Sequence, residues 1–367
     1  MVRILQYCES LSDFDRFWEE PVKSRTPIVL TLLAALIALV VAGCGGSSDE
    51  KGGDDSAGSS GDAKTELSLV AYSTPQVVYD EIIPDFAKTA EGRGVGFKTS
   101  YGASGDQSRA VEAGQKADVV TFSTEPDMTR LVDAGLVSND WNSGPNRGLV
   151  TTSVVSFIVR KGNPKNIRTW DDLLRPGIKV LTPNPFTSGA AKWNILAAYG
   201  QAARGGSDPQ AGLDYVRELI TRHVEVQDRS GREALQTFVS GDADVLLSYE
   251  YEATTAQKKG EEVDYVTPDD TIKINIDIAT TRDAPAQARA FLDYVLSEPA
   301  QQRFADWGYR PVNETVLAAN RDRFPEPSGL FTIEDLGGWS RVNDEMFDVE
   351  KGSIAKIEEE AGVSTAK

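Results

Sequence analysis

Cysteine and histidine are scarce in this chain. Its 367 residues include two cysteines, Cys8 and Cys44, and one histidine, His223. Zinc sites need several Cys or His ligands and disulfides need cysteine pairs, so the composition argues against both, and no calcium-loop pattern is present. We expect His223 to be an ordinary histidine at a strand end or on the surface. The folded part must therefore rely on its apolar core.

The motifs of common hydrolases are absent as well. No G-x-S-x-G elbow occurs, and the loop at residues 101–105 lacks the partners of a catalytic triad. Ser188 and Lys192 are four residues apart, which differs from the S-x-x-K spacing. Because no nucleophile, metal or other cofactor is indicated, we expect a protein that is not an enzyme.

Positive charge is also in short supply. The 38 Lys and Arg residues are outnumbered by 56 Asp and Glu residues, which gives a net charge of −18. Such an acidic chain is a poor partner for nucleic acid. The overall field does not help an anion either, so any bound anion must be held by local donors.

One long apolar run occurs, at residues 28–41, and it is shorter than the about 20 residues that a transmembrane helix needs. Lys23 and Arg25 precede it, and Val-Ala-Gly-Cys ends it at Cys44. This pattern resembles a bacterial lipobox, which predicts cleavage before Cys44 and lipidation of its thiol; the alternative is a membrane anchor. Residues 1–43 are then a leader. Its first part is acidic, unlike a signal peptide, so we expect translation to start at Val22.

Residues 44–65 are mostly Gly, Ser and Asp, which predicts a flexible tether. After the tether, strand-like and helical patterns alternate, which is typical of an α/β protein with mostly parallel sheets. The strand-like runs are 67–71, 95–100, 118–122, 151–160, 179–182, 244–248 and 273–279, and the helical patterns are 77–89, 127–133, 214–221, 232–240 and 286–296.

The folded part is long for one sheet, and this predicts two lobes. The apolar strand at 151–159 could pass from one lobe to the other, and 263–279 could return. The expected domains are lobe 1 at 66–153 plus 269–350, lobe 2 at 154–268, and a C-terminal helix or tail at 351–367.

Loops of small residues recur where helices are predicted to begin. The clearest lies in TPNPFTSGAAKWNILAAYG at 182–200, where a strand pattern is followed by Thr-Ser-Gly and a helical run, and similar loops occupy 72–75, 101–107 and 230–232. The first turn of a helix has unpaired N–H groups and partial positive charge, which suit an anion. Taken singly each loop could be an ordinary N-cap. Together they indicate one shared anion site, because such ends line the crevice of α/β sheets.

Several motifs carry a resemblance to a known family. They are VRKGNPK at 159–165, the 182–200 segment and DVLLSYEYEA at 244–253, with LFTI at 330–333 and GGW at 337–339. Over about residues 67–347, the sequence resembles the periplasmic sulfate- and thiosulfate-binding proteins of ATP-driven (ABC) importers. The resemblance implies a periplasmic-binding-protein fold of type II, in which two α/β lobes joined by two crossover strands close on a dehydrated anion.

The resemblance also implies the residues that bind the anion. By matching motifs they are Ser104, Ser188, Gly189, Ala190 and Gly231. Two further positions depart from the family pattern: Ser73 stands where an acidic residue is usual, and Tyr249 where a tryptophan donor is usual. We include both as anion contacts, and their departure leaves the identity of the anion open.

Two charged residues flank these positions. Asp106 could accept the proton that phosphate keeps at neutral pH, or it could complement a helix N-terminus and face water. Arg232 could pair with the anion, or it could hold a backbone carbonyl or a carboxylate behind its loop. A site made only of donors favours sulfate over phosphate, because sulfate carries no proton at neutral pH.

We therefore expect an extracytoplasmic, lipid-anchored solute-binding protein. It would capture sulfate or thiosulfate as a monomer and deliver the anion to an ABC permease with its ATPase. One alternative is another oxyanion, such as phosphate or molybdate. A second alternative, from a different class, is a surface hydrolase of phosphate or sulfate esters.

Overall fold

The computed structural model describes residues 64–366 of the chain. The predicted leader, the lipidation site Cys44 and most of the tether lie outside these residues. Within them, no helix combines the length and the apolar character that crossing a bilayer requires.

Strands and helices alternate along the described residues, and the α/β prediction is confirmed. The strands are β1 (Thr65–Tyr72), β2 (Val95–Gly102), β3 (Val119–Phe122), β4 (Leu149–Arg160), β5 (Val180–Leu181), β6 (Val224–Val226), β7 (Val245–Tyr249), β8 (Val263–Val266), β9 (Asp270–Thr280), β10 (Arg310–Pro311) and β11 (Gly329–Phe331). The helices are α1 (Gln76–Phe86), α2 (Ser104–Glu112), α3 (Glu125–Asp133), α4 (Trp170–Leu173), α5 (Gly189–Ala202), α6 (Pro209–Arg222), α7 (Gly231–Ser240), α8 (Glu250–Lys258), α9 (Ala286–Val295), α10 (Glu298–Asp306), α11 (Glu314–Ala319), α12 (Gly338–Val342) and α13 (Ser353–Glu360), with short turns η1 (Arg321–Arg323) and η2 (Asn343–Phe347).

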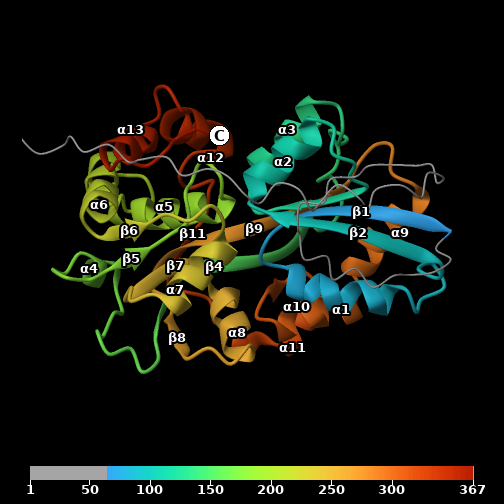
Figure 1. The fold of residues 1–367 in the computed structure, drawn as a ribbon, viewed down its shortest axis with the longest axis horizontal. Coiled ribbons are helices and arrows are strands. Elements are labelled where there is room, and N and C mark those ends of the chain that lie inside the picture. Colours follow the sequence, from blue (N-terminus) through green and yellow to red (C-terminus); the bar gives the residue numbers. More distant parts are fainter. Residues whose placement is uncertain (1–63, 367) are drawn as a thin grey trace, which may run out of the picture. The chain divides into compact units, whose positions relative to one another are not determined.

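Two groups of parallel strands lie on either side of the antiparallel pair β4 and β9 (Figure 1). In the first, which we call the β1 group, β1 pairs with β2 and β3. In the second, the β5 group, β5 pairs with β6 and β7. β3 joins β9 and β7 joins β4, both antiparallel. The sheet is therefore mixed, with parallel strands at both ends.

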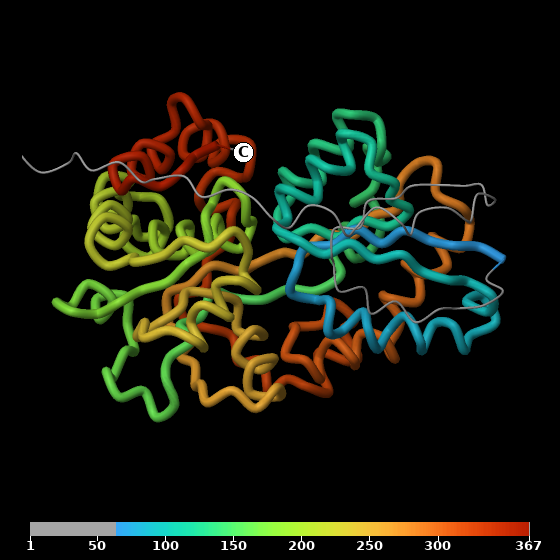
Figure 2. The backbone as a smooth tube through the Cα atoms, viewed as in Figure 1, coloured from blue at the N-terminus to red at the C-terminus, as the bar shows by residue number. Residues whose placement is uncertain are grey.

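β4 and β9 connect the two groups. The first half of β4 pairs with β9, and its second half pairs with β7 and β8. In the tube view of Figure 2, the chain passes between the two groups along these paired segments. Nearly every residue of β4 is buried, as expected for a strand that is covered on both faces. The long apolar run at 151–159 is explained by this position.

The core beside the β1 group is aromatic. The ring of Phe86 in α1 meets those of Phe97 and Phe291 edge-on, with centroids 6.2 and 5.2 Å apart. Tyr79, two turns earlier on the same face of α1, contacts Phe304 in the same T-shaped manner at 5.8 Å. Such edge-to-face contacts add to the apolar burial that holds α1, α9 and α10 on this face of the sheet.

The position of α5 is fixed by burial on all sides. Most of its residues are buried, including Trp193 and Leu196, and it contacts α6, β7 and β9. A helix that is apolar all round belongs in the interior. Its first residue, Gly189, is thereby held at a defined place beside the ends of the strands.

The C-terminal segment packs near α5 and α6. β11 pairs in parallel with β9, and the ring of Phe331 occupies the space over Gly200, where an added Cβ would lie 2.3 Å away. The indole of Trp339 meets that of Trp193 edge-on at 4.7 Å, and α13 contacts α6. Part of this segment, up to residue 350, was predicted from the sequence to belong to lobe 1. The lobe boundaries themselves stay a prediction.

Candidate anion-binding site

α2, α5 and α7 begin at one place between the two strand groups. The backbone N–H of Gly105 in α2 donates to the carbonyl of Thr187, just before α5, at 3.2 Å. A Cβ placed on Gly231, the first residue of α7, would lie 3.7 Å from the Cβ of Ala190 and 3.5 Å from Cγ2 of Thr74. The structure thus brings together the four loops that the sequence analysis selected.

The start of α5 has no side-chain cap. Its N-cap, Ser188, accepts no hydrogen bond from the helix, whereas Ser230 accepts one from a backbone N–H of α7 at 3.2 Å. Ser188, Gly189 and Ala190 are all buried. Unpaired N–H groups at a buried helix start attract negative charge. These residues and Gly231 stand close together, and their binding of an anion stays a prediction.

Ser104, the first residue of α2, is bonded to a buried carboxylate. Its Oγ donates to Oδ2 of Asp127 at 2.7 Å and accepts the N–H of Ser123 at 3.1 Å. The same carboxylate accepts from Thr124 at 2.9 Å and from Arg130 at 3.3 Å. A hydroxyl has a single proton, so Ser104 in this arrangement offers only a lone pair to a further partner.

Ser73 and Arg232 lie where β1 leads into α1. Ser73 directly follows β1 and is buried. The guanidinium of Arg232 donates to Oε1 of Gln76 at 2.6 Å and to the carbonyl of Thr74 at 3.4 Å. Arg232 therefore holds the β1–α1 loop against α7. Its contact with the Thr74 carbonyl fits the second alternative given above, in which Arg232 holds a backbone carbonyl.

Tyr249 ends β7 and is completely buried. Its hydroxyl has no hydrogen-bond partner among the described residues. Burial raises the pKa of Tyr249 well above its ordinary value, and the nearby Ser123 hydroxyl opposes this rise only in part. Its ring meets that of Tyr251 edge-on at 5.1 Å. The phenol therefore keeps its proton and has it available for donation.

The two glutamates in the first turn of α8, Glu250 and Glu252, are buried, so this helix start is not solvated. Glu250 forms an ion pair with Arg310, including an Oε2 to Nη2 contact of 3.0 Å. Glu252 lines a cavity with Arg232 and Lys259, and burial raises its pKa to about 7.

Ser123 and Trp193 were missed by the sequence analysis. Ser123 directly follows β3, and its carbonyl accepts from Nε1 of Trp193 at 2.5 Å. Its hydroxyl is buried without a partner among the described residues, and an added Cβ on Gly189 would lie 2.2 Å from it. A signal existed in the sequence, because Ser123 follows its strand as Ser73 follows β1.

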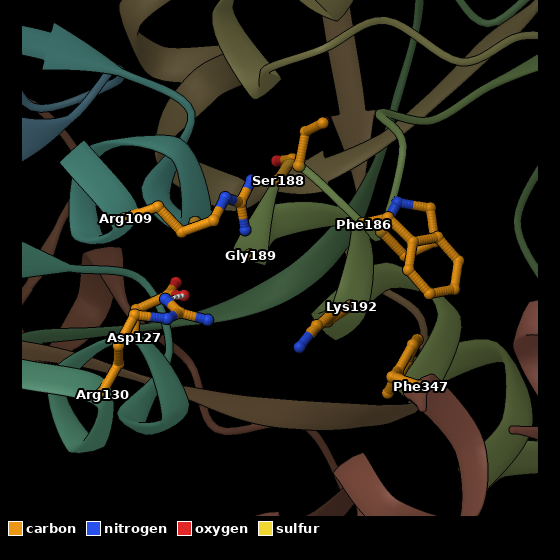
Figure 3. A pocket seen from close by; sticks show the side chains of 11 residues that line it. Arg109, Asp127, Arg130, Phe186, Ser188, Gly189, Lys192 and Phe347 are labelled. Carbon is orange, nitrogen blue, oxygen red and sulfur yellow. Dashed lines mark hydrogen bonds and ion pairs between the residues drawn. The ribbon is translucent and has the colours of Figure 1, made fainter. Parts of the chain in front are cut away.

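A basic cavity opens beside the start of α5. Figure 3 shows Arg109 and Arg130 reaching it from α2 and α3, and Lys192 from α5 on the other side. Ser188 and Gly189 line the same cavity. Cationic side chains therefore stand next to the helix start, although the whole chain is acidic.

Asp106 does not simply face water. Its Oδ1 accepts from Arg109 at 2.5 Å, and its Oδ2 accepts from Arg229 at 2.6 Å. The second contact joins α2 to the loop before α7. Both oxygens of Asp106 are thus engaged by guanidinium groups, which weakens the hypothesis that it takes the proton of phosphate.

Residues 64–366 contain no group of three or more His, Cys, Asp or Glu side chains arranged to hold a metal ion. His223 caps the end of α6 and is buried, with Nδ1 3.3 Å from the carbonyl of Ile178. The structure thus places this histidine directly before β6, at a strand end as expected, and buried rather than on the surface.

A mixed α/β sheet with parallel strands at both ends, linked by β4 and β9 beside a cradle of helix starts, defines a periplasmic-binding-protein fold. Residues 67–310 match the family model described as bacterial extracellular solute-binding protein. The chain belongs to this family, and its place is therefore extracytoplasmic.

Named relatives share most of the chain. The sulfate-binding protein of Synechococcus elongatus is 38% identical over 86% of this chain and 91% of its own length. The thiosulfate-binding protein of Pseudomonas aeruginosa is 34% identical, over 79% and 91%. The structure of the sulfate-binding protein SubI from Mycobacterium tuberculosis is 49% identical with a TM-score of 0.76, over 77% of this chain and all of that one.

Proposed function

We propose that this protein binds sulfate, or thiosulfate, in the cradle between the two strand groups and delivers it to an ABC importer. The observation that carries the proposal is the meeting of the uncapped starts of α2 and α5 with buried hydroxyls that have no hydrogen bond among the described residues. The relatives named as sulfate- and thiosulfate-binding proteins support it. The protein acts as a carrier and carries out no reaction.

The proposed anion contacts are the positions selected from sequence: Ser73, Ser104, Ser188, Gly189, Ala190, Gly231 and Tyr249. Ser104, the first residue of α2, would donate its backbone N–H, because its hydroxyl proton goes to Asp127. A hydrogen bond to a charged group contributes about 1.5–3 kcal/mol. Some five to seven such bonds would contribute roughly 8–20 kcal/mol before dehydration of the anion and lobe closure are subtracted. Micromolar affinity needs about 8 kcal/mol. Binding is therefore feasible without a cation in direct contact with the anion.

Two lobes, 66–153 plus 269–350 and 154–268, would close on the anion. Contacts that cross between the strand groups support this closure, among them the hydrogen bond from Gly105 to Thr187 and the ion pair of Asp106 with Arg229. The strands β4 and β9 would serve as the hinge, since both contribute to each side.

Hydrogen phosphate is a second candidate, favoured by one observation. Ser104 gives its proton to Asp127, so its remaining lone pair could accept the proton of phosphate. Against phosphate, the carboxylates of Asp106 and Asp127 are both occupied by other donors. We expect sulfate to bind more tightly for this reason.

A competition titration tests the choice of anion. Isothermal calorimetry of the mature chain with sulfate, thiosulfate, phosphate and molybdate should give 1:1 binding of sulfate at micromolar or lower concentration. Tighter binding of phosphate or molybdate, or no binding of any of the four, would contradict the proposal. Turnover of fluorogenic phosphate or sulfate esters would instead support the hydrolase alternative.

The membrane attachment and the partners are part of the same proposal. Cys44 would carry the lipid, the protein would be a monomer, and the partner would be an ABC permease with its ATPase. In cells given radiolabelled palmitate, Cys44→Ser should abolish labelling, and Cys8→Ser is the matched control that should keep it. Labelling that persists in Cys44→Ser would refute the lipid anchor. A precursor peptide containing residues 13–16 would refute a start at Val22.

A further inference from the structure

Ser123 is held rigidly at the centre of the cradle. Its N–H donates to Oγ of Ser104 at 3.1 Å, and its carbonyl accepts from Trp193 Nε1 at 2.5 Å. These two partners come from α2 and α5, the helices whose starts form the cradle. Both backbone groups of Ser123 are therefore fixed, and only the hydroxyl remains to act.

That hydroxyl lies against the start of α5. It is 2.2 Å from the position where a Cβ on Gly189 would stand, and Ser123 is only 1% exposed. A buried hydroxyl without a partner costs free energy. The phenol of Tyr249 is buried as well, and the adjacent Ser123 hydroxyl interacts with it and lowers its pKa. Neither hydroxyl forms a hydrogen bond of normal length and angle with any described residue. Two such groups beside one uncapped helix start point to a missing acceptor.

We propose that Ser123 is an anion ligand, which donates its hydroxyl proton to an oxygen of the bound oxyanion next to Tyr249. This inference rests on the proposed function and adds a contact that no family motif in the sequence indicates. A phenol extends from its ring at a different angle from an indole N–H. Ser123 would then donate to the anion beside Tyr249, the residue that stands where the family usually has a tryptophan donor.

The pairing has a consequence for selectivity. Ser123 and Tyr249 both bring a proton, so they favour an oxygen that carries none. An oxygen of sulfate or thiosulfate fits this description, and a protonated oxygen of phosphate does not. Ser123 therefore adds to the preference for an oxygen without a proton.

The test compares Ser123→Ala with Thr151→Val. Thr151, in β4, also has a buried hydroxyl without a partner among the described residues, but it lies within a strand and not at the cradle. We expect Ser123→Ala to weaken sulfate binding about 10- to 100-fold by calorimetry, the loss of one bond to a charged group. Thr151→Val should keep the affinity within about twofold.

Thermal unfolding of the empty protein adds a readout that a purely structural role would not produce. Because the Ser123 hydroxyl has no partner there, Ser123→Ala should leave the Tm unchanged or raise it. Unchanged affinity in Ser123→Ala, or a lowered Tm with unchanged affinity, would overturn the inference. If the unaltered protein binds none of the four oxyanions, the proposed function fails instead, so the two failures are distinguishable.

Discussion

Replacing Gly189 with alanine tests whether the first turn of α5 holds the anion. The added Cβ would lie 2.2 Å from Oγ of Ser123 and 2.8 Å from Cγ2 of Thr124, both too close for any real contact. Rotation of the Ser123 hydroxyl would leave the second clash in place, because the Thr124 side chain is held by its hydrogen bond to Asp127 at 2.9 Å. The start of α5 must move instead. Overpacking of this kind costs about 1–3 kcal/mol of unfolding free energy.

The displacement should affect binding as well as folding. If it removes one hydrogen bond to the anion, about 1.5–3 kcal/mol is lost, which weakens sulfate binding about 10- to 100-fold. Gly231→Ala is the matched control. A Cβ there meets Thr74 and Ala190 at 3.5 and 3.7 Å, which are ordinary contacts, and its N–H is retained. We expect Gly231→Ala to bind within about threefold of the unaltered protein.

Calorimetry with sulfate measures the affinities of both variants, and thermal unfolding shows that each is folded. The reasoning is refuted if Gly189→Ala binds as tightly as the unaltered protein. It is equally refuted if Gly231→Ala loses as much affinity, because a Cβ there makes only ordinary contacts and leaves the N–H in place.

Three further outcomes are expected. Burial raises the pKa of Glu252 from 4.5 to about 7, so its contribution to stability is full below about pH 4.5 and is lost as the pH rises through about 7. Chemical denaturation should show a loss of roughly 3 kcal/mol in unfolding free energy over this range, and Glu252→Gln should lack that loss. Equal pH profiles for the two proteins would contradict this prediction. Trp193→Phe removes the donor to the Ser123 carbonyl and should lower the unfolding free energy by about 1–3 kcal/mol in the same assay, and an unchanged value would contradict the contact's importance. Arg229→Gln breaks an exposed ion pair with Asp106 and should change sulfate affinity no more than about threefold. This small effect should disappear in 0.5 M NaCl, because salt screens exposed charges. A larger effect that salt does not reduce would show that Arg229 contacts the anion.

Much of the fold could be predicted from sequence, because the long strands and helices carry strong local patterns. The apolar run at 151–159 predicted β4, the run at 179–182 predicted β5, and the segment at 182–200 predicted the loop and helix α5. Elements of two or three residues, such as β6 and β10, show no periodicity. They exist because neighbouring strands offer backbone partners, which no local pattern reveals.

In the candidate site, too, the residues that a local pattern marks could be predicted, and those that distant contacts bring together could not. Gly189 and Gly231 were found because each stands in a local loop-to-helix pattern. Asp127 and Ser123 were not, since their role depends on Ser104, which lies about twenty residues away and meets them only through strand pairing. The burial of Glu250 was equally invisible, because its partner Arg310 is 60 residues away in the sequence.

The neutralisation of nearby acids explains how so acidic a chain could hold a dianion. Asp106 is matched by two guanidinium groups, Asp127 by Arg130, and Glu250 by Arg310. The potential at the cradle is then set by the helix starts, which act at contact distance. The remaining negative charges of the chain act over longer distances, where salt screens them beyond about 8 Å. On the proposed function, net charge therefore slows the approach of the anion, whereas the cradle's own donors determine its affinity.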